Sequence, residues 1–228
     1  LKAAKLEPRF VMSYDNLANI HFSLKKFDQA IKYFEKCIEL EPSNSIYLRA
    51  TAEAYIEKED FATAISYYNK AQELTPNEYM IYNELGSTLV LKKEYEQGKE
   101  KFNRAIELGN EEVKSYAYKG LADLKRKQRK YDEAIELYKQ SISLYSENNE
   151  SKLGMAFCFS KKGNNQEAIV TVKSILEKDS QNAKAYFDLG KYYNLEKRTE
   201  ESLESFKKAC EFGETKACAE NGGKKNKK

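Results

Sequence analysis

The sequence contains no tryptophan, one histidine, three prolines and ten glycines in 228 residues. With so few prolines and glycines, there are few places where a long helix has to break. Lys, Glu, Leu and Ala are abundant, and charged residues make up 33% of the chain. This composition predicts a mostly helical protein with solvated charged faces. The net charge of +3 is too small to indicate a polyanionic partner by itself.

Long hydrophobic runs are also missing. No apolar stretch approaches the roughly 18 residues that a membrane span requires, so we expect no transmembrane segment. The first residues, LKAAKLEPRF, lack the hydrophobic core of a signal peptide. Either the protein is cytoplasmic, which is slightly favoured over an exported or periplasmic location, or the sequence begins after a processed or trimmed N-terminus.

Motifs of the common catalytic sites are absent. The chain has no Gly-rich phosphate loop, no HExxH and no CxxC pair. The one histidine, His21, falls inside a predicted helix, where we expect a packing role rather than a ligand or a base. Carboxylates are scattered along predicted solvent faces. We therefore expect no enzyme, no metal and no cofactor.

What the sequence does contain is a repeat. Small residues recur at spacings of 34, 34, 36, 34 and 34, namely Ala30, Ala64, Gly98, Ala134, Ala168 and Ser202. Four residues after each comes a large apolar residue, from Phe34, Tyr68, Phe102, Tyr138, Val172 and Phe206. Seven residues after each comes Cys37, Ala71, Ala105, Ser141, Ile175 or Ala209. These spacings place all three positions on one face of a helix.

Each repeated unit contains a second helical segment upstream of the first. Examples are YDNLANIHF from Tyr14 and YNELGSTLV from Tyr82. Pro42 and Pro76 close the first two units, as expected where a helix ends. Each unit is therefore predicted to be two helices joined by a tight turn. The small residue lets the helices approach, and the large residue four positions later fills the space between them.

This unit resembles the tetratricopeptide repeat, whose pattern is W-x2-L-G-x2-Y followed by a small residue, an aromatic residue and Pro. The third unit matches at Tyr82, Leu85, Gly86, Gly98, Phe102 and Ala105. The resemblance covers about residues 11 to 216. It implies an all-α fold, a right-handed α-solenoid of six stacked helix-turn-helix repeats at 11–44, 45–78, 79–112, 115–148, 149–182 and 183–216.

The two ends of the chain fall outside these six repeats. Residues 1–10 are interpreted as the remnant of a preceding repeat or as an N-terminal cap. Residues 217–228 are expected to form a basic, disordered tail.

In tetratricopeptide arrays the first helix of each repeat lines a concave groove. The resemblance therefore implies a non-catalytic scaffold or adaptor that binds peptide segments of one or more partner proteins. The predicted groove residues of the first three repeats are Met12, Asp15, Asn19, Phe22, Ile46, Arg49, Glu53, Ile56, Met80, Asn83, Ser87 and Val90. The later repeats are more charged, with Phe157 and Phe187 as isolated apolar candidates. The alternative is that some of the apolar residues only pack on the adjacent helix.

A basic run, KRKQRK, contains Lys125, Arg126, Lys127, Arg129 and Lys130. It offers a second function, contact with nucleic acid or an anionic surface, against the alternative of a solvated turn. Because 39 basic residues are nearly balanced by 36 acidic ones, we do not expect a nucleic-acid partner. Two further alternatives are that the chain is the regulatory array of a larger protein, and that it self-associates through the ends of the solenoid.

The four cysteines are too sparse for a disulfide-built fold. Cys37 and Cys158 are expected to be small buried apolar residues. Cys210 and Cys218 resemble the cysteine pair of secreted Sel-type repeat proteins, which are relatives of the tetratricopeptide class. That resemblance implies a disulfide and hence export, and two ordinary thiols are the alternative.

Overall fold

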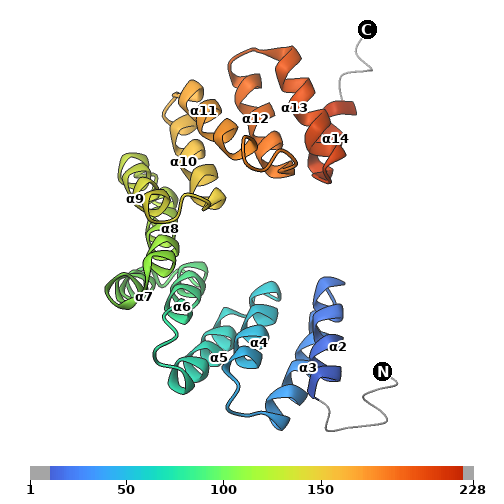
Figure 1. The fold of residues 1–228 in the computed structure, drawn as a ribbon, viewed down its shortest axis with the longest axis vertical. Coiled ribbons are helices and arrows are strands. Elements are labelled where there is room, and N and C mark those ends of the chain that lie inside the picture. Colours follow the sequence, from blue (N-terminus) through green and yellow to red (C-terminus); the bar gives the residue numbers. More distant parts are fainter. Residues whose placement is uncertain (1–10, 223–228) are drawn as a thin grey trace. The chain divides into compact units, whose positions relative to one another are not determined.

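The computed structural model describes residues 11–222, and in that range the chain is built from helices with no strand. Within each of the two units described below, Figure 1 shows consecutive helices lying beside one another. They are α2 (Val11–Ser23), α3 (Phe27–Leu40), α4 (Ser45–Glu57), α5 (Phe61–Leu74), α6 (Met80–Leu91), α7 (Tyr95–Leu108), α8 (Glu111–Lys127), α9 (Tyr131–Leu144), α10 (Asn149–Lys161), α11 (Asn165–Leu176), α12 (Ala183–Leu195), α13 (Thr199–Glu211) and α14 (Thr215–Gly222). The predicted all-α repeat solenoid is confirmed.

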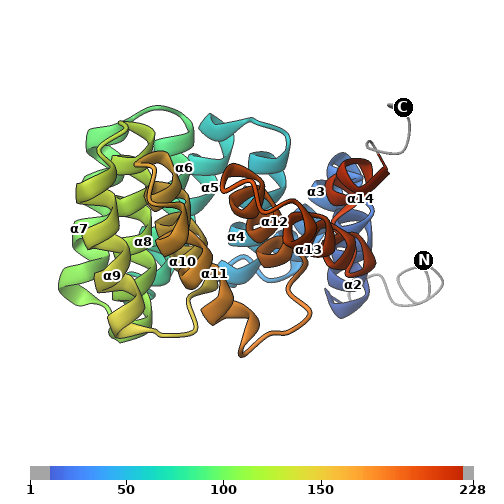
Figure 2. The same ribbon diagram turned by 90° about the horizontal axis from the view of Figure 1, so that it is seen from above.

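The chain divides into two compact units, the first ending at Val113 and the second beginning at Lys114. Within each unit a helix packs mainly against the next helix along the chain. The pairs α10–α11 and α12–α13 lie side by side in both views (Figure 2). Each pair thus covers an apolar face that its neighbour cannot bury alone. None of the described helices is long and apolar enough to cross a membrane.

The core consists of the residues that the repeat predicted. All three repeated positions of each second helix are buried, with at most 7% of any side chain exposed. They are the small residue after each turn, the large residue four positions later and the residue seven positions later. A further small position lies on the first helix of each pair, at Ala18, Ala52, Gly86, Ala122, Ala156 and Gly190. A Cβ atom on Gly86 would lie 2.9 Å from the ring of Phe102, so the two helices meet closely only because this position is small.

The predicted tight turn within each pair has one recurring geometry. The second residue after the first helix has a positive φ in every pair, at Lys25, Glu59, Lys93, Arg129, Gly163 and Lys197. The next N–H bonds back to a carbonyl five residues earlier, as from Asp60 to Tyr55 at 2.9 Å. This is a Schellman helix end, and only Gly163 adopts it without the steric cost of a Cβ atom.

Asparagine side chains begin several of the first helices. Asn44, Asn148 and Asn182 each accept a hydrogen bond from a backbone N–H in the first turn that follows. Asn110 does the same for the N–H of Val113 at 2.9 Å. Helix α8 therefore begins at Glu111, four residues before the predicted start of the fourth repeat at 115.

The C-terminal prediction is partly wrong. Residues 217–222 belong to helix α14 rather than to a disordered tail. Ala217 is fully buried in a cluster with Phe206 and Ala209 of α13, and burial of this small residue orders the segment. The predicted remnant at 1–10 and the rest of the tail at 223–228 lie outside the described residues.

Candidate functional site

An exposed apolar row runs along the first helices of unit 1. Met12, Ile46 and Met80 occupy equivalent positions near the starts of α2, α4 and α6, each 34 residues from the next. Met12 is 59% exposed and Ile46 is 62% exposed, whereas Met80 is half-buried. Beside Ile46 lies a hollow of about 630 Å³, lined by residues 41–46 and Glu78. The row offers apolar contact area that folding has left open.

The predicted groove residue Arg49 already has partners within the chain. Arg49 Nε donates to Glu84 Oε2 at 2.9 Å, and its terminal nitrogens pair with Glu78 and Glu84. The hydrogen bond that Arg49 donates to Glu84 is the main cause that raises the pKa of Arg49. Burial, and then the charge of Glu84, raise the pKa of Glu53. The sequence indicated Arg49 but not its two carboxylate partners, Glu78 just before α6 and Glu84 within α6.

Two other predicted polar residues remain at the surface. The Asn19 amide donates to the backbone oxygen of Asp15 at 3.0 Å and to its carboxylate at 2.9 Å. Asn19 therefore bonds within its own helix. Ser87 of α6 is exposed.

The assignment of Val90 and Asn83 to the groove is wrong, because both side chains are buried. Val90 is 6% exposed and packs against Gly98 of α7. A Cβ atom added at Gly98 would lie only 2.8 Å from a Val90 methyl group. Asn83 is 5% exposed and donates from Nδ2 to the backbone oxygen of Val113 at 2.9 Å. Both side chains hold neighbouring helices together instead of facing a partner.

The predicted groove residues Phe22 and Ile56 are partly exposed. Phe22 meets Phe27 edge-on, with ring centres 5.5 Å apart. Ile56 packs against the core cluster that includes Leu48 and Tyr68. Val90 therefore packs inside the repeat array, as the alternative for the apolar groove residues expects, whereas Phe22 and Ile56 use only part of their surface for packing.

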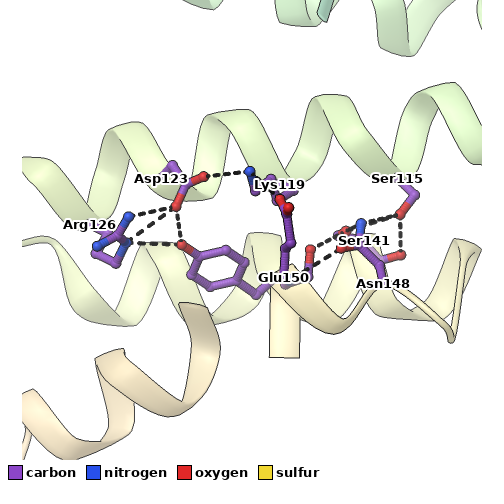
Figure 3. A network of polar contacts seen from close by, with 9 residues as sticks. Ser115, Lys119, Asp123, Arg126, Ser141, Asn148 and Glu150 are labelled. Carbon is purple, nitrogen blue, oxygen red and sulfur yellow. Dashed lines mark hydrogen bonds and ion pairs between the residues drawn. The ribbon is translucent and has the colours of Figure 1, made fainter. Parts of the chain in front are cut away.

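Unit 2 has a charged pocket on its first helices. Its volume is about 300 Å³, and its lining from α8, α10 and α12 consists of Lys119, Asp123, Arg126, Glu150, Leu153, Gly154, Phe157, Lys184 and Asp188. Figure 3 shows the polar part, in which Lys119 and Arg126 converge on Asp123. Lys119 Nζ lies 3.3 Å from Asp123 and 2.8 Å from Glu150.

Asp123 is the centre of this network. Its Oδ1 accepts from the hydroxyl of Tyr138 at 2.6 Å and from Arg126 at 2.9 Å. Burial alone favours the neutral acid, but Lys119, Tyr138 and Arg126 outweigh it and lower the pKa of Asp123. The sequence predicted Tyr138 only as a large packing residue. The signal for its second role, donating a hydrogen bond to Asp123, was the hydroxyl group, which Phe34 and Phe102 lack at the equivalent positions.

The two apolar candidates of unit 2 lie under cations. The ring of Phe157 has the Arg126 guanidinium and the Lys161 ammonium each 5.3 Å from its centre. Phe187 lies 5.7 Å from Phe206 and has Lys191 at 5.3 Å. Both rings are half-buried, so they present an edge beside charge rather than an open apolar face.

A separate buried cluster links α8, α9 and α10. Ser115 Oγ donates to the Ser141 backbone oxygen at 2.9 Å, and Asn148 Nδ2 donates to Ser115 Oγ at 3.0 Å. Ser151 Oγ lies 2.7 Å from Ser141 Oγ. Because these groups satisfy one another, we assign them a structural role.

The basic run does not form one cationic surface. Lys125 and Lys130 both pair with Glu133, at 2.5 Å and 3.6 Å. Arg126 turns to Asp123, leaving Lys127 and Arg129 exposed near the turn. The charges are thus dispersed over different faces.

The cysteines separate into the two predicted kinds. Cys37 and Cys158 are buried, and burial raises the pKa of Cys37 to about 12 and that of Cys158 to about 11. The sulfurs of Cys210 and Cys218 lie 1.99 Å apart, at disulfide distance, and join the end of α13 to α14. In the described part of the chain, no group of three or more His, Cys, Asp or Glu residues is placed to hold a metal.

Comparison with known proteins agrees with this geometry. Models of the tetratricopeptide repeat match residues 16–44, 51–78, 78–147, 125–191 and 183–212, so the chain belongs to the tetratricopeptide repeat family. Repeats of this family form interaction surfaces, and the chain is a protein-interaction scaffold of that class. A search of curated proteins found no significant match.

Solved structures show the same fold at low sequence identity. A tetratricopeptide repeat protein from Parabacteroides merdae is 21% identical with a TM-score of 0.75, covering 96% of this chain and 86% of that one. Yeast Tom70 is 20% identical with a TM-score of 0.79, covering 96% of this chain and 46% of that one. YrrB, described as a repeat protein with an unusual peptide-binding site, is 23% identical with a TM-score of 0.52, covering 84% and 97%.

Proposed function

We propose that the protein is a non-catalytic scaffold that binds an extended or helical segment of a partner protein along the first helices of unit 1. The observation that supports this proposal is the exposed apolar row of Met12, Ile46 and Met80. Three consecutive repeats place a long aliphatic side chain at the same position, where repeats five and six place Glu150 and Lys184. Repeat packing alone therefore does not require an aliphatic residue there.

The row suits anchoring by a few apolar side chains of a partner. Burying one exposed aliphatic side chain contributes roughly 1.5–3 kcal/mol, so two or three contacts give measurable affinity. The surrounding carboxylates Asp15 and Glu53 lie on the same helices and accept hydrogen bonds from a partner's backbone or side chains. YrrB, a structural relative, is described as having a peptide-binding site, which is consistent with this use of the fold.

The experiment is a capture assay with the Met12→Glu/Ile46→Glu double variant. Both side chains are mostly exposed, so the variant is expected to keep its helical content. We expect a partner retained by the wild type, identified by mass spectrometry, to be lost by this variant. Val170→Glu is the matched control, because Val170 is also 59% exposed but lies on α11, the second helix of its pair. Equal retention by the double variant would exclude the row as the binding site.

A further inference from the structure

A second hollow lies in unit 1 between α3 and α5, the second helices of the first two pairs. Its volume is about 570 Å³. The apolar part of its lining consists of Ile38, Pro42, Leu48, Tyr67 and Leu74. Leu48 of α4 is 4% exposed and forms the floor, while Leu74 is 43% exposed at the rim. Leu48 and Ile46 lie on different faces of α4, because two residues rotate about 200° around a helix.

An equivalent hollow of about 580 Å³ lies one repeat later, beside Tyr82, where its lining includes Lys101, Arg104 and Glu107. The hollow between α3 and α5 differs from it in having an apolar lining. Leu48 stands where four other repeats carry Tyr14, Tyr82, Tyr118 and Tyr186. In the sixth repeat that tyrosine reaches Phe212, with ring centres 5.7 Å apart. Leucine lacks the hydroxyl of these tyrosines, so Leu48 contributes an entirely apolar side chain to the hollow beside α3 and α5.

Repeat packing does not require this lining to be apolar. Between α9 and α11 the positions equivalent to Leu48, Tyr67 and Leu74 are Lys152, Thr171 and Lys178. The repeats that contain α9 and α11 therefore stack through α10 with polar side chains at all three positions. The apolar residues between α3 and α5 are therefore additional to what the fold needs.

One wall is held in place. The Tyr67 ring stacks on Tyr55 at 5.6 Å, and its hydroxyl donates to Glu35 at 3.4 Å. Glu35, Glu39 and Glu73 are exposed at the rim with one lysine, Lys70. Because Glu39 pairs with Lys36 at 2.5 Å, the excess negative charge comes from Glu35 and Glu73. The Lys70 ammonium lies 5.1 Å from the centre of the Tyr67 ring. A preformed apolar wall beside excess negative charge favours a cationic, partly aromatic ligand.

We propose that this hollow is a second docking site, which binds a partner-protein segment whose aromatic side chain is flanked by lysine or arginine. The aromatic ring enters the hollow between Leu48 and Tyr67. The flanking cations pair with Glu35 and Glu73 at the rim. This site is separate from the row of Met12, Ile46 and Met80, so the two can be tested independently.

The probe is a fluorescein-labelled nine-residue peptide with a central phenylalanine and two lysines on each side. Its comparison peptides carry serine at the centre or glutamates in place of the lysines. By fluorescence anisotropy, we expect the first peptide to bind at least 10-fold more tightly than either comparison, with affinity that weakens as salt rises.

Leu48→Tyr, which inserts the residue of the other repeats, and Glu73→Lys should each weaken binding of the first peptide at least 10-fold. The matched control is Glu107→Lys, at the equivalent exposed position of the third repeat, and it should retain wild-type affinity. Ile46→Glu should also retain it, which separates failure of this site from failure of the proposed function.

Unchanged affinity in Leu48→Tyr with preserved circular dichroism, or no preference for phenylalanine, would overturn the proposal. If Leu48→Tyr does not fold, Leu74→Ser replaces it and should also lower the affinity. Sedimentation of the wild type provides a further check. Self-association that Leu48→Tyr abolishes would identify a second copy of the chain as the occupant and reject a partner segment.

Discussion

At the scale of single residues, Tyr138 combines a packing role with a polar one. Its ring is fully buried and lies against Gly154 of the next repeat. Its hydroxyl donates to Asp123 and accepts from Arg126 at 3.1 Å. The ring position therefore decides both the contact between α9 and α10 and the charge network on α8.

Gly154→Ala should lower the free energy of unfolding by about 2 kcal/mol. The new Cβ would lie 2.4 Å from the Tyr138 ring and 2.5 Å from its hydroxyl oxygen, and the hydrogen bond to Asp123 restrains the ring from moving. Urea unfolding measures the loss. In the double variant with Tyr138→Leu the cost should be less than the sum of the two single costs, because the clash is gone. Additive costs would contradict this account.

Asp123 should make stability depend on pH in the acid range. Its pKa is lower in the folded protein than in the unfolded chain, where the pKa of an aspartate is about 3.9. Its contribution to stability is therefore complete above that value and is lost as the pH falls through the folded pKa. Between pH 7 and pH 3, Asp123→Asn should show a shallower fall in the free energy of unfolding than the wild type.

Urea titrations at several pH values test this expectation. Tyr138→Phe keeps the carboxylate but removes one hydrogen bond to it, so its curve should lie between those of the wild type and Asp123→Asn. Parallel curves for all three proteins would show that the network does not shift the Asp123 titration.

At the scale of helices, the period of the sequence predicted most of the elements. The spacing of small and large residues predicted where α3 and α5 lie. The proline after each of these helices predicted where it ends. The early start of α8 was missed because it depends on the Asn110 side chain bonding to Val113, a local cap without its own spacing signal. Helix α14 was missed because Ala217 becomes buried only when α13 is present.

The link between α13 and α14 leads to a prediction about the two cysteines. Closing a loop of eight residues stabilises a chain by about 2.5 kcal/mol in the chain-entropy model. Cys210→Ser/Cys218→Ser should therefore reduce the hydrogen-exchange protection of the α14 amides, and reducing the wild type should have the same effect. Unchanged protection in both cases would mean that burial of Ala217 alone holds α14.

At the scale of the whole molecule, stability should be local. In each unit a helix packs chiefly on its sequence neighbours, so energy lost in one repeat reaches only adjacent repeats directly. Gly154→Ala should lower the exchange protection of α9 and α10 by about 30-fold if it costs ~2 kcal/mol. Amides of α2 and α3 in unit 1 should change little. A uniform loss across the chain would indicate a single cooperative transition instead.

The candidate site was only partly predictable. The repeat placed Met12, Ile46 and Met80 at equivalent positions on the first helices. It did not show that Val90 is buried or that Arg49 is paired. The partners of Arg49, Glu78 and Glu84, lie 29 and 35 residues further along the chain and come into reach only when the next repeat stacks.

By itself, the sequence determined the helical class, the 34-residue period and the buried positions, because helix periodicity and side-chain size are properties of local segments. The tertiary structure decided which side chains stay free for a partner. It also decided that an apolar hollow lies between α3 and α5, since an open space depends on how far the side chains of two neighbouring repeats extend toward each other.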